Sequence, residues 1–183
     1  MRSFVVLASA AVFGAVDQYL GSFSAHPWMA DVSLLSAPWL VLPFAAGLFG
    51  RSPRGAALLG AAATFLALVG YCLMTLSPAE NAHLSVDGVV AFIRAGNYRW
   101  FLAGLVTGPV LGAMAYVARA RRAAALAVSV AALLCLEPVV HALRGLPIRS
   151  SAVAAGEVAV GVTFMVAAWW AARDGRLTAR EQA

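Results

Sequence analysis

Apolar segments of membrane-crossing length follow one another along most of the chain, separated by short polar connections. An α-helix needs about 20 predominantly apolar residues to cross the hydrocarbon core of a bilayer. Six segments meet that requirement: Ser3–Ser22, Leu34–Gly50, Arg54–Leu76, Tyr98–Arg119, Arg121–Leu143 and Ala152–Ala172. The pattern predicts six transmembrane helices, and the roughly ten-residue alternation of a membrane β-barrel is absent from the sequence.

The connections between these segments differ in length and character. Two of them, 51–54 and 119–122, are short enough to form only tight hairpin turns. Apolar residues recur at helical spacing within the longest connection, Ser77–Asn97, which predicts a short helix lying on the membrane surface. These residues are Val86, Val89, Val90 and Ile93.

Composition narrows the fold class. Hydrophobic residues make up 62% of the 183 residues and charged residues only 11%. A soluble domain carries about 25% charged residues, so we predict an all-α polytopic membrane protein that forms a single domain over residues 1–183. The first segment also resembles a signal peptide, because Arg2 precedes an apolar run. Asp17 and Gln18 interrupt that run, which favours a retained first helix.

The positive charge is concentrated at the ends of the apolar segments. The net charge is +5, and all thirteen basic residues are arginine. Their position at segment ends, rather than in a stripe, argues against nucleic acid as a partner. Most of them fall in the turns 51–54 and 119–122 and in the tail after Ala172. The positive-inside rule therefore places these regions and both termini in the cytoplasm, as in a multi-pass protein of a bacterial cell membrane. The connections 23–33, 77–97 and 144–151 then face outward.

Three carboxylates lie inside the predicted spans: Asp17, Glu137 and Glu157. With the predicted orientation and a rise of about 1.5 Å per residue, each lies roughly 8 Å below the outer end of its helix. Ionisable residues inside a membrane are costly and indicate functional sites. Together with the other polar and aromatic residues at this level they form the predicted ligand-binding set, which is Asp17, Gln18, Trp39, Tyr71, Arg99, Trp100, Glu137, His141 and Glu157.

The cost of exposing a charge to lipid predicts how these side chains are arranged. The three carboxylates should converge on one cavity open to the outer face, with Arg99 within reach of at least one of them. Structural alternatives stay open. Arg99 and Trp100 fit interface anchors, Asp17 fits a purely structural ion pair with Arg99, and Glu137 fits a partner for backbone groups freed by Pro138.

Signatures of catalysis, metal binding and cofactor binding are absent from the sequence. There is no His-Glu-x-x-His, no Gly-x-Ser-x-Gly and no glycine-rich phosphate loop. Cys72 and Cys135 lack metal-ligand spacing and are predicted to be small buried hydrophobes, and a disulfide between them has no support. We expect neither a metal nor a cofactor. Gly104, Gly108 and Gly112, four residues apart, predict close helix packing.

Several segments resemble an uncharacterised family of small actinobacterial integral membrane proteins, which implies a membrane protein but no particular activity. These segments are 17–21, 38–44, 99–109 and 136–138. The architecture is also similar to the substrate-binding subunits of energy-coupling-factor vitamin transporters, in which the first helix packs on a coupling subunit through an Ala-x-x-x-Ala pattern. Ala11 and Ala15 fit that pattern, so this fold-level resemblance implies transporter subunits as partners.

The leading hypothesis is a membrane protein that binds a small molecule from the outer side as part of an uptake or export system. Three acids against one deep arginine favour a cationic or amphipathic ligand. One alternative is a membrane-embedded enzyme acting on a lipid or isoprenoid, with Asp17, Glu137 or Glu157 as general acid. A second alternative is a non-catalytic accessory subunit whose polar layer holds the helices together.

Overall fold

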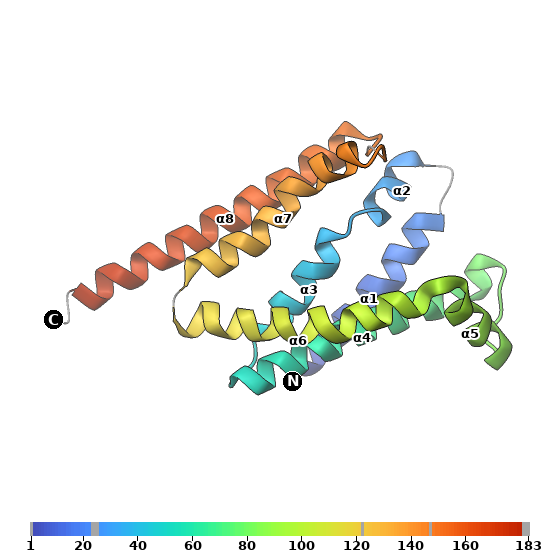
Figure 1. Cartoon of the computed structure of the whole chain (residues 1–183), viewed down its shortest axis with the longest axis horizontal. Coiled ribbons are helices and arrows are strands. Elements are labelled where there is room, and N and C mark those ends of the chain that lie inside the picture. Colours follow the sequence, from blue (N-terminus) through green and yellow to red (C-terminus); the bar gives the residue numbers. More distant parts are fainter. Residues whose placement is uncertain (1, 23–25, 122, 147, 181–183) are drawn as a thin grey trace.

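The computed structural model describes residues 2–22, 26–121, 123–146 and 148–180, with only the backbone of Arg2 and of residues 171–180. All regular structure in this part of the chain is helical (Figure 1). The helices are α1 (Arg2–Ser22), α2 (Pro27–Ser33), α3 (Ala37–Gly47), α4 (Pro53–Thr75), α5 (Val86–Phe92), α6 (Tyr98–Ala120), α7 (Ala124–Leu143) and α8 (Ser151–Arg180). A 3₁₀ turn at Pro78–Glu80 and a π turn at Ile93–Asn97 flank α5.

The predicted class of an all-α polytopic membrane protein is confirmed. Five helical segments in the described residues are long and apolar enough to cross a membrane: Ser3–Ser22, Pro53–Thr75, Val86–Ala120, Ala124–Leu143 and Ser151–Trp170. The remaining predicted span, Leu34–Gly50, contains only the 11-residue helix α3, which meets the preceding helix α2 at an angle of 51°. The number of spans is six if this bent pair crosses the membrane as one unit.

The sequence-based boundaries fail around this bend and at the end of the last span, where α8 continues to Arg180 instead of ending at Ala172. The connection 23–33, predicted to be a loop, contains α2, which begins at Pro27, a residue favoured in the first turn of a helix. Residues 23–25 and Arg122 lie outside the described residues, as do the side chains of Arg2 and of the arginines after Ala172. The short helix predicted within Ser77–Asn97 is confirmed as α5, and its place on a membrane surface stays a prediction.

Glycines bring α1, α4 and α6 into backbone contact. A Cβ atom added to Gly112 of α6 would lie 2.3 Å from the carbonyl oxygen of Ala56 on α4. One added to Gly14 of α1 would lie 1.8 Å from the carbonyl oxygen of Ala67 on α4. No side chain fits in these contacts, so the close packing predicted from the glycines of α6 is confirmed. Together with α3, which packs on α4 and α6, these helices form the core bundle.

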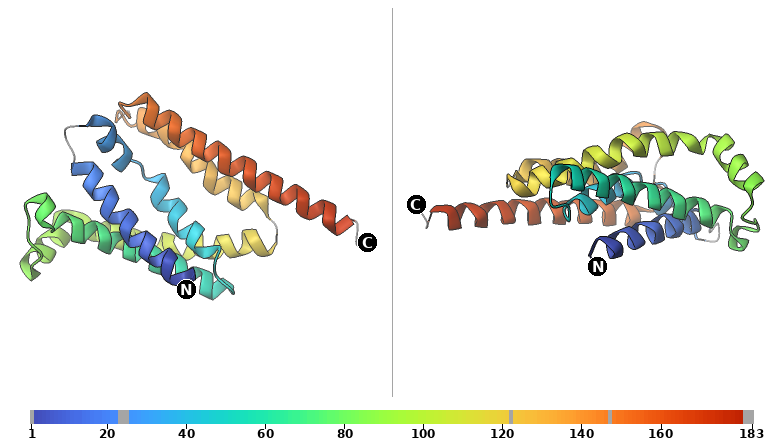
Figure 2. Two further views of the ribbon diagram at one scale, coloured as in Figure 1. Left: turned by 180° about the vertical axis from the view of Figure 1, so that it is seen from behind. Right: turned by 90° about the horizontal axis from the view of Figure 1, so that it is seen from below.

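The helices α7 and α8 form a hairpin that leans against the core bundle (Figures 1 and 2). Val130 of α7 contacts the core bundle in a buried apolar cluster with Phe44 of α3 and with Ala115 and Ala118 of α6. A cavity of about 440 Å³ lies between the hairpin and the core bundle, lined by side chains of α3, α6, α7 and α8. The lining is apolar except for Arg119.

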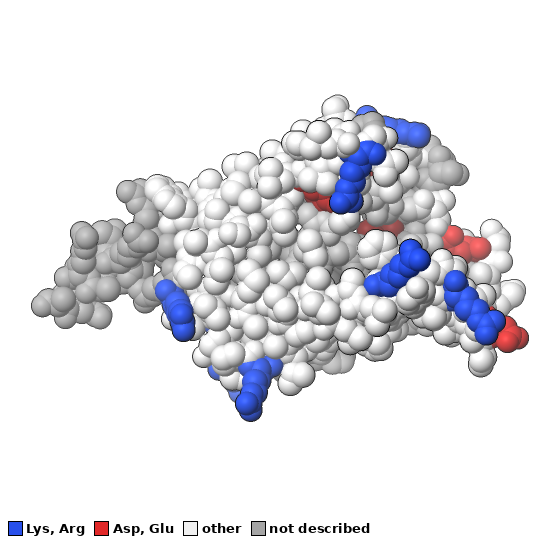
Figure 3. Space-filling model, viewed as in Figure 1, with Lys and Arg blue, Asp and Glu red and all other residues white. Residues whose placement is uncertain are grey.

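The two ends of the molecule differ in charge (Figure 3). The arginine end is defined by Arg51, Arg54, Arg119 and Arg121, which follow α3 and α6. Ser3 of α1 lines a hollow with Arg51 and Arg119, and Ala168 of α8 lines the cavity beside Arg119, so the first and last helices meet this end. The described carboxylates belong to the opposite, acidic end, which also carries exposed arginines. They are Asp17, Asp31, Glu80, Asp87, Glu137 and Glu157, with Arg94, Arg99, Arg144 and Arg149.

Candidate functional site

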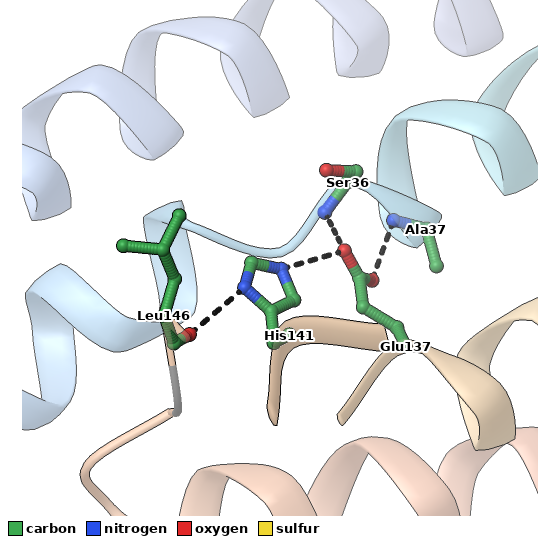
Figure 4. Close-up of polar contacts among 5 residues, drawn as sticks. All are labelled: Ser36, Ala37, Glu137, His141 and Leu146. Carbon is green, nitrogen blue, oxygen red and sulfur yellow. Dashed lines mark hydrogen bonds and ion pairs between the residues drawn. The ribbon is translucent and has the colours of Figure 1, made fainter. Parts of the chain in front are cut away.

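The break between α2 and α3 leaves backbone N–H groups in the first turn of α3 without partners in their own helix. The Ser36 side chain does not cap them. Glu137 of α7 does so instead, accepting hydrogen bonds from the backbone N–H groups of Ser36 and, at 2.7 Å, of Ala37 (Figure 4). A carboxylate is favoured at a helix N-terminus by the charge-assisted bonds and by the helix dipole. Glu137 therefore fastens α7 to the start of α3.

His141 lies one turn after Glu137 on α7 and continues this network. Its Nε2 is 3.4 Å from Oε1 of Glu137, and its Nδ1 is 3.2 Å from the carbonyl oxygen of Leu146 (Figure 4). Both ring nitrogens face oxygen acceptors, an arrangement in which a protonated imidazole donates twice. His141 thus links Glu137 to the turn that follows α7.

Glu157 of α8 is in a different situation. It is only 6% exposed, and its carboxyl group lies against that of Glu137. Neither of its oxygens accepts a hydrogen bond from any described residue. Burying a carboxylate without a partner is costly, and buried polar groups in native proteins are nearly always paired. Among the described residues, Glu157 is the one whose buried side-chain oxygens the protein leaves unsatisfied.

Asp17 contacts a second polar cluster, on α1, α3 and α4. Its Oδ2 accepts a hydrogen bond of 3.3 Å from the indole N–H of Trp39. The Trp39 ring packs edge-on against Phe13 at 5.2 Å and Tyr71 at 6.1 Å between ring centres. In Figure 1, α3 lies between α1 and α7, so Asp17 and Glu137 approach α3 from different helices. Asp17, unlike Glu157, is satisfied within the protein.

The nine predicted site residues thus separate into groups. Glu137, His141 and Glu157 come together, and Asp17, Trp39 and Tyr71 come together, but no hydrogen bond or ion pair joins the two groups within the described residues. The 440 Å³ cavity is lined by none of the nine. The predicted convergence of all three carboxylates on one cavity stays a prediction.

Three predicted residues lie outside both groups. Arg99 is exposed, with its guanidinium 5.9 Å from the ring centre of Tyr98, and it forms no ion pair with a carboxylate of the described residues. The expected pairing of Arg99 with an acid is wrong. Trp100 is 65% exposed, and Gln18 donates to the Ser22 hydroxyl on its own helix. The positions of Arg99 and Trp100 fit the alternative of interface anchors.

Comparison with known proteins does not change this picture. No family model, curated protein or solved structure matches the chain. The resemblances to small actinobacterial membrane proteins and to transporter subunits stay predictions. A Cβ atom added to Gly70 of α4 would lie 2.0 Å from the carbonyl oxygen of Ala11 on α1. The Ala11 face of α1 therefore already packs on α4. A partner contact through Ala11 and Ala15 also stays a prediction.

Two charged residues outside the predicted ligand-binding set hold helices together. Asp31 is 3% exposed, and its Oδ2 accepts a hydrogen bond of 2.6 Å from the backbone N–H of Ser150, which joins α2 to the start of α8. Pro27 signals a helix start before Asp31 and was the one available clue to this role. Arg119 donates to the carbonyl oxygens of Leu48 and Gly50, beyond the end of α3, a role that no sequence pattern indicated.

The cysteines form no site. Cys72 and Cys135 are half-buried and free, and the Cys135 thiol lies 3.7 Å from the carbonyl oxygen of Val158. The described residues contain no cluster of three or more His, Cys, Asp or Glu side chains that could hold a metal ion. The chemistry of the acidic end therefore rests on its carboxylates and His141.

Proposed function

We propose that this chain is a multi-pass membrane protein that binds a small, positively charged molecule at Glu137 and Glu157 and works as a binding or transport subunit. The observation that carries the proposal is the Glu157 carboxyl group, which is buried against Glu137 and whose oxygens accept no hydrogen bond from any described residue. A cationic ligand would supply the donors and the charge that this group lacks. The positive-inside rule supports an outward-facing position for the site.

The neighbouring groups favour a cation over an anion. The Glu137 carboxyl lies beside that of Glu157, and His141 is the one basic side chain in an ion pair with either acid among the described residues. Two carboxylates against one imidazole leave the pair negative or proton-sharing, and either state attracts an ammonium donor. Glu137 already holds the start of α3, so Glu157 is the more available of the two acids.

The accessory-subunit alternative has its own supporting observation. Glu137 and Asp31 both accept backbone N–H bonds that join the α7–α8 hairpin to α2 and α3, which is what structural polar contacts do. The enzyme alternative gains less support, because the sequence carries no signature of catalysis beside these acids. The accessory role predicts that Glu157 also is structural. Substitution of Glu157 therefore distinguishes this alternative from the binding role.

The test is calorimetric titration of the protein in lipid nanodiscs with ethylammonium, a small alkylammonium ion with little apolar surface. Binding should weaken at least about tenfold in Glu157→Gln, because a hydrogen bond to a charged group is worth about 1.5–3 kcal/mol. Glu80→Gln is the matched control, since Glu80 lies in the loop after α4 and outside the pair. Binding that is absent, or equal in all three proteins, would remove the basis of the proposal.

A further inference from the structure

The apolar cavity and the carboxyl pair occupy the same seam between the hairpin and the core bundle. On α7, Leu134 lines the cavity, and Glu137 follows it by three residues on the same helix face. On α3, Val41 lines the cavity, and Ala37, whose N–H donates to Glu137, precedes it by four residues. Both walls of the seam therefore place the near end of the cavity about one helical turn, roughly 5 Å, from the Glu137 carboxyl.

On the third wall of the seam, the cavity begins farther from the carboxyl pair. Glu157 of α8 and the cavity-lining Phe164 are seven residues apart, which puts them two turns apart on one face. The lining of the cavity carries one charged residue, Arg119, beside apolar side chains. The volume of about 440 Å³ lies within the roughly 300–1,000 Å³ range of small-molecule sites.

We infer that the ligand is an amphipathic amine, whose ammonium group binds at Glu137 and Glu157 while its apolar body extends along the seam into the cavity. This inference rests on the proposed function and adds the chemical class of the ligand. The ammonium group satisfies the Glu157 oxygens. The apolar body fills the space lined by Val41, Phe44, Val130 and Leu134 and gains the free energy of leaving water. A small hydrophilic cation would use only the first of these two parts.

The test compares a series of n-alkylammonium ions (ethyl, butyl and hexyl) in wild-type protein and in Val41→Trp. Val41 is half-buried at the near end of the cavity, so the indole fills the path of the alkyl chain. Val110→Trp is the matched control, because Val110 is 52% exposed on α6 and lines no part of the cavity. All proteins are held in nanodiscs of the same lipid, so partitioning of the amines into the bilayer is common to every measurement.

Affinity should rise by up to about fourfold for each methylene buried in the wild type and in Val110→Trp. In Val41→Trp the ethylammonium affinity should persist, while the gain from ethyl to hexyl falls at least tenfold. Equal chain-length gains in Val41→Trp and Val110→Trp, with ethylammonium binding still dependent on Glu157, would overturn the amphipathic ligand and leave the proposed function intact. Loss of all Glu157-dependent binding across the series would overturn both. Ala127→Phe, which fills the same cavity from α7, serves if Val41→Trp fails to fold.

Discussion

Glu137 and Glu157 lie side by side but differ in the hydrogen bonds that their carboxyl groups accept. Glu137 is bonded to two backbone N–H groups and to His141, whereas the Glu157 oxygens accept no hydrogen bond from a described residue. Hydropathy alone treats both as buried acids near the end of a span. Their difference depends on which way each helix is rotated, and it separates a structural residue from a candidate ligand-binding residue.

This difference predicts opposite effects of neutralisation on stability. Glu137→Gln leaves one N–H at the start of α3 facing an amide NH₂ group, and it should cost about 1.5–3 kcal/mol. Glu157→Gln removes a buried acid whose oxygens accept no hydrogen bond from a described residue and provides an NH₂ donor towards Glu137, so the melting temperature should stay the same or rise. Tryptophan fluorescence during heating of the purified protein measures both. Equal destabilisation by the two substitutions would assign Glu157 a structural role.

At the scale of the elements, α3, with the residues that flank it, forms hydrogen bonds with three other spans, α1, α6 and α7. It receives Glu137 from α7 at its start, and its Trp39 donates to Asp17 of α1, while Arg119 of α6 caps the carbonyl groups that follow it. The break before α3 could not be read from the sequence, because its partner Glu137 lies 100 residues away from Ala37. The long spans could be predicted from the sequence, since their length and apolar composition are local properties of each segment.

The bond between Asp31 and Ser150 should hold the hairpin to α2. Asp31→Ala removes the acceptor and leaves the Ser150 N–H without it, at a cost of about 1–3 kcal/mol. Amide hydrogen exchange should therefore speed up in residues 148–154, while exchange in α4 stays unchanged because α4 packs on α1 and α6. Unchanged exchange at the start of α8 would show that the hairpin is held by its apolar contacts alone.

The contact between α4 and α6 depends on the absence of a side chain at Gly112. Gly112→Ala would place a Cβ 2.3 Å from the Ala56 carbonyl oxygen, so the helices must separate and the melting temperature should fall. Gly156→Ala on α8 is the matched control, because nothing lies within 4 Å of its added Cβ. That change should be neutral or stabilising by about 0.5–1 kcal/mol. Equal melting temperatures for the two variants would contradict the backbone contact.

For the whole molecule, the charge difference between the ends predicts its orientation in the membrane. In a protein whose native cysteines are replaced, Asp87→Cys at the acidic end should react with a membrane-impermeant maleimide in intact bacterial cells. Arg121→Cys at the arginine end should react only after the cells are permeabilised. Both positions are exposed, so accessibility within the protein is matched. The reverse labelling pattern would place the carboxyl pair on the cytoplasmic side.

The acidic end as a polar layer could be predicted from the sequence, because depth along each helix follows from residue number. Which side chains meet within that layer could not, because it depends on helix rotation and on the bend before α3. Asp17 therefore pairs with Trp39 rather than with Arg99, and Glu157 is left beside Glu137. Of the two carboxyl groups, only that of Glu157 has buried oxygens that accept no hydrogen bond from a described residue.

The central claim is that the Glu157 carboxyl receives the charged group of a ligand. It is tested most directly by a crystal structure of the protein soaked with 4-bromobenzylammonium, whose bromine can be located by anomalous scattering. The anomalous peak should lie in the seam between α3, α7 and α8, within one ligand length of Glu157, and it should disappear in Glu157→Gln. A bromine located elsewhere in the protein, or a peak that persists in Glu157→Gln, would contradict the claim.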